Sequence, residues 1–557
     1  MNRTSFVMSR TYTWVSSAFT VGILALVMFA NSLADAQTLS VLYNFGSNNG
    51  DPEIPQAPGI IVQGLDGNLY TTSPIGGTNN LGTVFTITPA GSLSVLYNFD
   101  GVHGSLPYGG LTLGTDGNFY GTTYASNTGS GTIFQFNPPA TLTVLYQFSG
   151  APPDGGSPYA APIQGTDGNL YGTAIYGGSK GLGSVYKLTP AGTLTTLHSF
   201  SGGDGKYPRT PLVQGTDGNF YGTASEGGKG AGNSGTVFRI TPTGALKVLY
   251  NFDKTHGQQP YAGLIQGNDG NFYGTTTSGG TEDSGVIYAI TPAGILTVLH
   301  SFNNLNEDGY LPYAGLTLGS DGNFYGAATN GGTGTYGTLF NISSGGTFSV
   351  LYDFLSFTGI EPEATLLQHT SGIFYGDTFT GGLGSNCTCG TFFRLDDGLT
   401  PFAALLPGSG RVGKSVGILG QGFTGTTAVS FNGTTATYQV VSDTYLTATV
   451  PKGATTGSIT VTTPGGPLAS KQTFRVTPLI RSFSPSSGAA GQPVIIKGIS
   501  LSQTTQVTFG GVIATTFTVN SDTQVTATVP TGAKTGHIAI TTLGGTATSP
   551  GTFTVTP

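Results

Sequence analysis

The chain has 557 residues, 92 of them glycine, with 11% aromatic and only 8% charged residues and a formal net charge of -7. A chain of this length exceeds one ordinary hydrophobic core, so we expect several domains or a repeat architecture. The aromatic content and the lack of a Gly-X-Y triplet exclude a collagen and a disordered chain. The weakly acidic charge, without any run of basic residues, argues against a nucleic-acid partner.

The first 36 residues have the features of a secretory signal peptide. Arg3 and Arg10 precede an apolar stretch over 18–30, and Ala-Asp-Ala at 34–36 provides a cleavage site before Gln37. The apolar stretch is shorter than the roughly 20 residues that a membrane-spanning helix needs. We therefore expect cleavage, a secreted or cell-surface protein and no membrane span afterwards. An uncleaved membrane anchor is the alternative.

A nine-residue phrase dominates the next part of the chain. It reads Gly-Thr-Asp-Gly-Asn-Phe-Tyr-Gly-Thr at 114–122, and close copies follow at intervals of about 50 residues. Asp-Gly-Asn favours a tight turn, and the flanking residues alternate as half-buried strands do, so the phrase predicts a β-hairpin. With a weaker first copy and a worn last copy there are seven, and the other six begin at Gly64, Gly165, Gly215, Gly267, Gly319 and Thr370.

Each unit of about 50 residues carries four strand signals, which is typical of a β-propeller blade. One further outer-strand segment, at 39–45, precedes the first complete unit. The corresponding segment of the last unit, 399–406, lacks the Tyr and Phe of the pattern. We predict a seven-bladed propeller over 37–400, in which the N-terminal strand completes the seventh blade. An open solenoid is the alternative.

The period changes near residue 401. Segments at 429–433, 447–451 and 457–462 recur as 507–511, 526–530 and 536–541, so the region is a tandem pair. Short strands with alternating Val and Thr predict two small β-sandwiches, over 401–477 and 478–557. The predicted fold class is therefore all-β, a seven-bladed propeller followed by two immunoglobulin-like sandwiches.

The second copy resembles the IPT/TIG immunoglobulin-like domain. The resemblance rests on Ile-Arg-Ser-Phe-Ser-Pro-Ser-Ser-Gly at 480–488, on Val-Ile-Ile-Lys-Gly at 494–498 and on the Val-Pro-x-Gly turn at 529–532. In the first copy, Leu-Pro-Gly-Ser-Gly at 406–410 stands in place of the Ser-Pro-x-x-Gly stretch.

The 50-residue units resemble the GloVer tandem repeat of secreted bacterial proteins, from about residue 39 to 397. The shared motifs are Asp-Gly-Asn-Phe-Tyr-Gly-Thr, Gly-Thr-Val-Phe-x-Ile-Thr and Leu-Thr-Val-Leu-Tyr-x-Phe. The resemblance implies surface display and assigns no activity to particular residues. Members have varied C-terminal anchors, but the final residues 553–557 are not followed by an apolar helix, basic tail or sorting motif. Anchoring is expected to be non-covalent, absent or left to the TIG pair.

The aspartates of the repeated phrase form a regular series that could suggest a metal site. An Asp in an Asp-Gly turn usually bonds its own backbone, and a calcium loop needs several oxygen ligands within one short segment. We therefore predict turn aspartates and no metal at Asp116, Asp167, Asp217, Asp269 and Asp321.

A Pro-x pair precedes the inner strand of each unit, at the expected mouth of the propeller channel. Tyrosine and planar polar groups at such a mouth suit sugar rings. The alternative is that the tyrosines only fill space between blades. The seven candidate ligand-binding residues are Gln56, Tyr108, Tyr159, Arg209, Tyr261, Tyr313 and Glu363.

Catalytic signals are weak, and we predict neither a catalytic residue nor a cofactor. A glycosidase-like carboxylate pair could assemble between blades from the acidic residues of the loops. The histidines, His103, His198, His256 and His300 among them, lack metal-ligand spacing. The loop carboxylates are Glu53, Asp154, Asp204, Glu226, Glu282, Asp283, Glu307, Asp308, Glu361 and Glu363.

Cys387 and Cys389 are the two cysteines of the chain. An exported protein could oxidise them, although a Cys-x-Cys ring is small, so a disulfide and two free thiols both stay open.

The sequence as a whole indicates an exported, non-enzymatic binding or display protein. Its expected partner is a polysaccharide or another cell-surface polymer, bound at the propeller mouth. A polysaccharide lyase or hydrolase that uses the loop carboxylates is one alternative, and a passive scaffold is another. No feature of the sequence indicates an oligomeric state.

Overall fold

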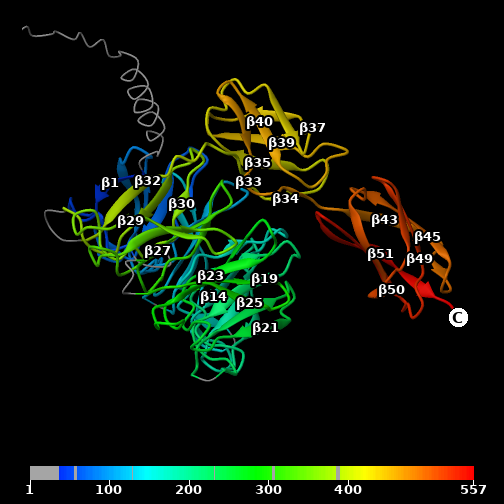
Figure 1. The fold of residues 1–557 in the computed structure, drawn as a ribbon, viewed down its shortest axis with the longest axis horizontal. Coiled ribbons are helices and arrows are strands. Elements are labelled where there is room, and N and C mark those ends of the chain that lie inside the picture. Colours follow the sequence, from blue (N-terminus) through cyan, green and yellow to red (C-terminus); the bar gives the residue numbers. More distant parts are fainter. Residues whose placement is uncertain are drawn as a thin grey trace, which may run out of the picture.

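The computed structural model describes residues 37–55, 59–127, 129–152, 154–230, 232–303, 308–383 and 389–557. Every regular element in these ranges is a β-strand, which confirms the all-β prediction (Figure 1). The same ranges contain no helix that is long and apolar enough to cross a membrane. The predicted signal peptide lies outside the described residues.

Seven four-stranded antiparallel sheets come first, and we number them as repeat sheets 1 to 7. Sheet 1 contains β3 (Val62–Gln63), β4 (Leu69–Ser73), β6 (Thr83–Ile87) and β7 (Leu93–Asn98); sheet 2 contains β8 (Thr112–Leu113), β9 (Phe119–Thr123), β10 (Thr132–Asn137) and β11 (Thr141–Gln147). Sheet 3 contains β13 (Ile163–Gln164), β14 (Leu170–Ala174), β16 (Ser184–Leu188) and β17 (Leu194–Ser199); sheet 4 contains β18 (Val213–Gln214), β19 (Phe220–Ala224), β20 (Thr236–Ile240) and β21 (Leu246–Asn251). Sheet 5 contains β22 (Ile265–Gln266), β23 (Phe272–Thr276), β24 (Val286–Ile290) and β25 (Leu296–Ser301); sheet 6 contains β26 (Thr317–Leu318), β27 (Phe324–Ala328), β28 (Thr338–Ile342) and β29 (Phe348–Asp353). Two small pairs flank them, β2 (Pro52–Glu53) with β5 (Ile75–Gly76) and β12 (Gly155–Gly156) with β15 (Tyr176–Gly177).

Repeat sheet 7 is built from both ends of the repeat region. It contains β30 (Leu367–Gln368), β31 (Phe374–Asp377), β32 (Thr391–Asp396) and, as its outer strand, β1 (Thr38–Asn44). The β1–β32 register runs from Thr38 opposite Asp396 to Asn44 opposite Thr391. The N-terminal strand therefore completes the seventh sheet, as predicted.

Aromatic stacking joins successive sheets. The Tyr of the repeated phrase is buried, and at five junctions it lies on the Phe of the next sheet, as in Tyr171 on Phe220, with ring centroids 3.9 Å apart. The hydrophobic clusters follow the same order, each combining residues of neighbouring sheets. One cluster combines Tyr375 of sheet 7 with Leu69 of sheet 1, so the packing also joins the last sheet to the first.

The Asp of each repeated turn bonds its own turn, as predicted. In sheet 2, Asp116 accepts hydrogen bonds from the Asn118 backbone N–H at 3.2 Å and from Asn118 Nδ2 at 2.7 Å. The Tyr120 hydroxyl donates to the same carboxylate at 2.8 Å. This hydrogen bond orients the ring that packs against sheet 3.

A left-handed residue precedes the rim proline of every repeat sheet. These residues have φ between 51° and 58°, and the backbone N–H of each donates to a carbonyl of a neighbouring unit. In sheet 5, the Gln259 N–H donates to the Ser234 carbonyl of the preceding unit, and its carbonyl accepts from the Thr277 N–H. Such an unfavourable conformation persists only where its surroundings determine it. The seven residues are Ile54, Leu106, Ser157, Tyr207, Gln259, Leu311 and Glu361.

Two β-sandwiches follow the repeat sheets. The first pairs β33 (Ala404–Leu406), β35 (Ser415–Leu419), β39 (Tyr445–Thr449) and β38 (Tyr438–Val440) against β37 (Thr434–Thr435), β36 (Ala428–Phe431), β40 (Ile459–Thr463) and β41 (Gly466–Ala469), with a parallel pair of β34 (Ser409–Gly410) and β42 (Arg475–Val476). The second pairs β43 (Leu479–Ser484), β45 (Pro493–Ile499), β49 (Gln524–Thr528) and β48 (Phe517–Ser521) against β44 (Ser487–Gly488), β51 (Gly545–Val555), β50 (Gly536–Thr542), β46 (Thr504–Phe509) and β47 (Val512–Ile513). Each sandwich has its own buried core.

The first sandwich is docked on the Asp-Gly-Asn end of the repeat sheets (Figure 1). The Thr444 hydroxyl donates to the Leu65 carbonyl at 2.7 Å, and Lys471 Nζ donates to the Leu318 carbonyl at 3.0 Å. Burial lowers the pKa of Lys471 to about 8, because desolvation disfavours the ammonium form. The opposite end of the inner strands, which carries the Pro-x segments, is left for other contacts.

We expect Gly235→Ala to destabilise the protein strongly. Gly235 has φ +99°, and a Cβ there would lie 2.6 Å from the Ala224 carbonyl oxygen and 2.7 Å from Pro260 Cδ. The left-handed conformation and the steric overlap together should cost about 3 kcal/mol. Thermal unfolding measures the loss. The control is Gly203→Ala, where a Cβ meets no atom within 4 Å, and an equal Tm for both variants would contradict this account of the rim turn.

Candidate functional site

The structure places six of the seven predicted rim residues at equivalent positions of repeat sheets 2 to 7. Each directly follows a buried proline and is itself half-buried. Gln56 lies outside the described residues. We call the six the rim cluster: Tyr108, Tyr159, Arg209, Tyr261, Tyr313 and Glu363.

Five members of the rim cluster form one continuous stack. The Tyr108 and Tyr159 rings stack with centroids 4.7 Å apart, and Tyr261 and Tyr313 stack at 5.5 Å. Between these pairs lies Arg209, whose Cζ is 6.0 Å from the Tyr159 ring centroid and 5.4 Å from that of Tyr261. Side chains from five successive sheets therefore meet at one place, which sequence spacing alone could not establish.

Three tyrosines of the rim cluster, Tyr108, Tyr159 and Tyr313, have a raised pKa and stay protonated over a wide pH range. Burial raises the pKa of Tyr159 and Tyr313 above the ordinary value for tyrosine. Glu363 raises both pKa values further, and Arg209 lowers them. One cation and one carboxylate thus act on the same tyrosines, whose O–H groups can donate hydrogen bonds to a ligand.

The Arg209 guanidinium makes no hydrogen bond and no ion pair with any residue that the structure describes. Its Nε is buried without a partner, and rings lie near it on two sides. The terminal N–H groups are left for an acceptor from outside the chain, and a planar guanidinium suits paired oxygen acceptors. The tyrosine faces contact one another and Arg209, so their hydroxyls are more available to a ligand than the ring faces that the sequence suggested.

Asp377 lies on β31 and was not singled out from the sequence. Five of the other repeat sheets have Thr in its register position, and these hydroxyls donate to a carbonyl of the next sheet's rim segment, as Thr173 does to Thr210 at 2.9 Å. Asp377 is 3% exposed, and its Oδ1 has no partner among the described residues. Burial, and secondarily Glu363, raises the pKa of Asp377 to about 8. The sequence does contain a sign of this residue, because Asp377 stands where the other copies of the repeat have Thr or Ala.

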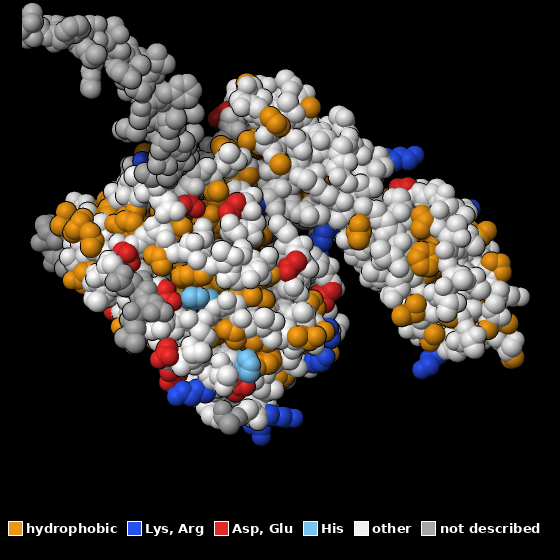
Figure 2. All heavy atoms as spheres, in the orientation of Figure 1, with side chains coloured by type: hydrophobic (Ala, Val, Ile, Leu, Met, Phe, Trp, Pro, Cys, Tyr) orange, Lys and Arg blue, Asp and Glu red, His pale blue; other side chains and the backbone are white. Residues whose placement is uncertain are grey.

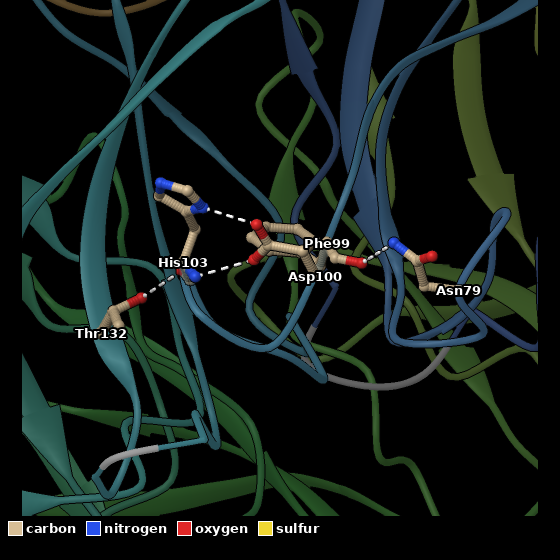
Figure 3. Close-up of polar contacts among 5 residues, drawn as sticks. All are labelled: Asn79, Phe99, Asp100, His103 and Thr132. Carbon is tan, nitrogen blue, oxygen red and sulfur yellow. Dashed lines mark hydrogen bonds and ion pairs between the residues drawn. The ribbon is translucent and has the colours of Figure 1, made fainter.

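The histidines in the repeat sheets close loops. Figure 3 shows one example, in which Asp100 accepts from the His103 backbone N–H at 2.8 Å and lies 2.7 Å from His103 Nδ1. The Thr132 hydroxyl donates to the His103 carbonyl at 3.2 Å. The same His–Asp pairing recurs at His198–Asp204, His256–Asp253 and His300–Asp308.

Several of the loop carboxylates proposed for catalysis also form ion pairs or hydrogen bonds with nearby residues. Glu226 pairs with Lys206 at 3.0 Å, and Asp283 pairs with Lys254 at 3.1 Å. On the face shown in Figure 2, charged side chains of both signs are sparse and scattered. Glu307 lies outside the described residues.

Of the two cysteines, for which the sequence leaves both a disulfide and free thiols open, the structure describes only Cys389. Cys389 is buried and disulfide-bonded. Cys387 lies outside the described residues, so the pairing of the two stays a prediction.

Comparison with solved structures gives only distant similarities. A fungal alcohol oxidase in complex with copper is 17% identical, with 80% of this chain and 100% of that chain covered at a TM-score of 0.43. A putative 6-phosphogluconolactonase from Bacteroides fragilis is 17% identical, with coverage of 60% and 98% and a TM-score of 0.40. A surface glycan-binding protein from Prevotella bryantii is 18% identical at a TM-score of 0.22, and the match covers 26% of this chain and 37% of that protein. None of the curated proteins matches the chain.

Two family models match the chain. Residues 478–555 match the IPT/TIG domain, so the second sandwich is a domain of this type. Overlapping matches to the Gloeobacter/Verrucomicrobia repeat cover residues 27–161, 55–268, 158–393 and 228–447. The chain therefore belongs to the family of proteins built from the Gloeobacter/Verrucomicrobia repeat.

Proposed function

We propose that this protein is an exported binding protein that recognises a glycan at the rim cluster of a seven-bladed β-propeller. The observation that carries the proposal is the convergence of side chains from successive sheets on Arg209, whose guanidinium has no protein acceptor among the described residues.

The propeller arrangement is supported by contacts between the first and last sheets. Ile60 forms parallel bridges with both Gly110 of sheet 2 and Thr365 of sheet 7. Gln63 exchanges two hydrogen bonds with Thr370, at 2.9 and 3.0 Å. These contacts place sheet 1 between sheets 2 and 7, as a closed ring requires.

Glycan recognition fits the chemistry of the rim cluster. Tyrosine hydroxyls, which can donate and accept, and a guanidinium fork together offer hydrogen bonds to a polyhydroxylated chain. The signal-peptide features place such a protein outside the inner membrane, at the cell surface or in the medium. We propose that the protein binds the glycan without cleaving it.

Acid–base cleavage of the bound glycan is a second candidate function, favoured by Asp377 and Glu363. A buried carboxylic acid that stays neutral near pH 7, next to a second carboxylate, is the pairing that glycosidases use. Both residues belong to repeat sheet 7 and replace the Thr and Tyr that are commonest at these positions in the other sheets.

We expect the double variant Tyr261→Ala and Tyr313→Ala to bind polysaccharide about tenfold more weakly than the parent chain, because it loses one stacked pair and two hydroxyl donors. The test incubates the chain from Gln37 with insoluble polysaccharides and measures its depletion from solution. Tyr250→Ala, which removes a tyrosine from β21, the outer strand of repeat sheet 4, is the matched control. Equal depletion for all three proteins would exclude the rim cluster as the site.

The same incubations separate binding from cleavage. Depletion without new sugar ends supports recognition alone. Release of sugar ends that is lost in Asp377→Asn would establish the second candidate function and reject binding without turnover.

We expect Asp377 to make stability depend on pH. Its folded pKa of about 8 lies above the unfolded value of about 4, so the folded state binds more protons in this window. Stability should fall as the pH rises from about 4 to 8, by at most about 1.4 kcal/mol per pH unit. Thermal unfolding at several pH values should show this slope in the parent chain and not in Asp377→Asn or Asp377→Thr. If the parent chain and the two variants gave parallel pH profiles, the assignment of this slope to Asp377 would be wrong.

A further inference from the structure

Among the hollows between the docked first sandwich and the repeat sheets, two lie on the Asp-Gly-Asn end and share part of their lining. One, of ≈ 580 Å³, lies between sheets 2 to 4 and the first sandwich. The other, of ≈ 670 Å³, lies between sheets 4 and 5 and both sandwiches. They share four lining residues, Gln214, Gly408, Gln472 and Arg475, so we treat them as one groove, the docking groove.

Arg475 is the shared charged residue of the docking groove. Its backbone is fixed, because its N–H donates to the Gly408 carbonyl at 3.0 Å and β42 pairs with β34. The guanidinium has neither a hydrogen bond nor an ion pair with any residue in the described ranges. Burial lowers the pKa of Arg475, while Asp217 opposes this shift, and an arginine remains charged at any physiological pH.

The acidic residues near Arg475 accept hydrogen bonds from residues of their own turns. Asp217 accepts hydrogen bonds from Asn219 and from the Tyr221 hydroxyl. Asp269, which lines the larger hollow, accepts in the same way from its own turn. In the smaller hollow, Arg475 is the charged residue of the lining and no acidic residue accompanies it. The groove therefore presents a cation whose natural counterpart is an anionic ligand.

Besides Arg475 and Asp269, the lining combines uncharged polar side chains with apolar ones such as Ile163 and Ile265. Gln472 borders both hollows, and its amide forms no hydrogen bond with a described residue. Thr112, Thr166 and Thr216 add hydroxyl-bearing side chains from three successive sheets. Amides and hydroxyls spread along several sheets suit an extended, hydroxylated chain better than a compact anion.

We propose that the docking groove is a second binding site, which takes a carboxylated oligosaccharide with its carboxylate on Arg475. The Gln472 amide bonds the hydroxyl groups of the adjoining sugar. The site lies at the opposite end of the inner strands from the rim cluster and does not depend on the function proposed there.

The test measures binding of oligogalacturonates to the chain from Gln37 by calorimetry, with the methyl esters of the same oligomers as uncharged ligands. Arg475→Met should weaken binding of the acid form at least tenfold, as expected for a lost charged hydrogen bond. Lys452→Met, which removes an exposed lysine of the same sandwich, is the charge control and should bind as the parent does.

A second variant fills the groove without touching Arg475. Gly408 lines both hollows, and a Cβ there meets no atom within 4 Å, so Gly408→Trp should fold and occupy the groove. It should reduce binding at least tenfold. Retained affinity in Gly408→Trp, equal affinity for acid and ester, or no binding of either oligomer would each overturn the proposal.

Rim variants separate this site from the first. Tyr261→Ala with Tyr313→Ala should leave oligogalacturonate binding unchanged. If that variant loses the binding and Gly408→Trp keeps it, the acidic ligand belongs to the rim cluster and the docking groove is rejected.

Discussion

The repeat region depends on one tyrosine in each phrase, which makes two contacts at once. Its ring lies on an aromatic ring of the next sheet at five junctions, such as Tyr221 on Phe272 at 3.9 Å. Its hydroxyl donates back to the Asp of its own turn, as Tyr221 does to Asp217 at 2.9 Å. Such stacking contributes about 0.5–1.5 kcal/mol for each pair beyond simple burial. The same residue therefore fixes the turn and sets the distance to the neighbouring sheet.

Much of this fold was readable because its determinants repeat. The interval of the phrase gives the number of sheets, and the extra strand at 39–45 predicts how the seventh is completed. The placement of the first sandwich could not be predicted, because residues such as Thr444 and Lys471 contact the repeat sheets once each and leave no periodic signal. The sequence also marks the rim positions, since a proline precedes each of them.

The geometry of the rim cluster was less predictable than its membership. A series of Pro-x pairs does not reveal that Arg209 lies between Tyr159 and Tyr261, because this depends on the angle between sheets and on side-chain rotamers. The importance of Asp377 was hidden for a similar reason. The sequence shows that Asp377 departs from the repeat, but its burial beside Glu363 is a property of the folded chain.

Because the chain has few charged residues, its arginines without an ion pair stand out as candidate binding groups. With only 8% charged residues, few carboxylates are near enough to neutralise a guanidinium. Arg209 and Arg475 lie at opposite ends of the inner strands, and neither forms an ion pair with the part of the chain that is described. The two ends of the repeat sheets thus differ in the residues that surround the arginine, which are tyrosines at one end and amides with hydroxyls at the other.

The pairing of β1 with β32 also has a consequence for how the chain folds. The first strand to be synthesised finds its partner only when Asp396 has been made, because Thr38 lies opposite that residue. Until then the half-buried side chains of β1 have no sheet to cover them, whereas sheets 1 to 6 are each built from strands close together in the sequence and can form earlier. Contacts of such long sequence separation form late and slowly. Repeat sheet 7 is therefore the last of the seven to be completed.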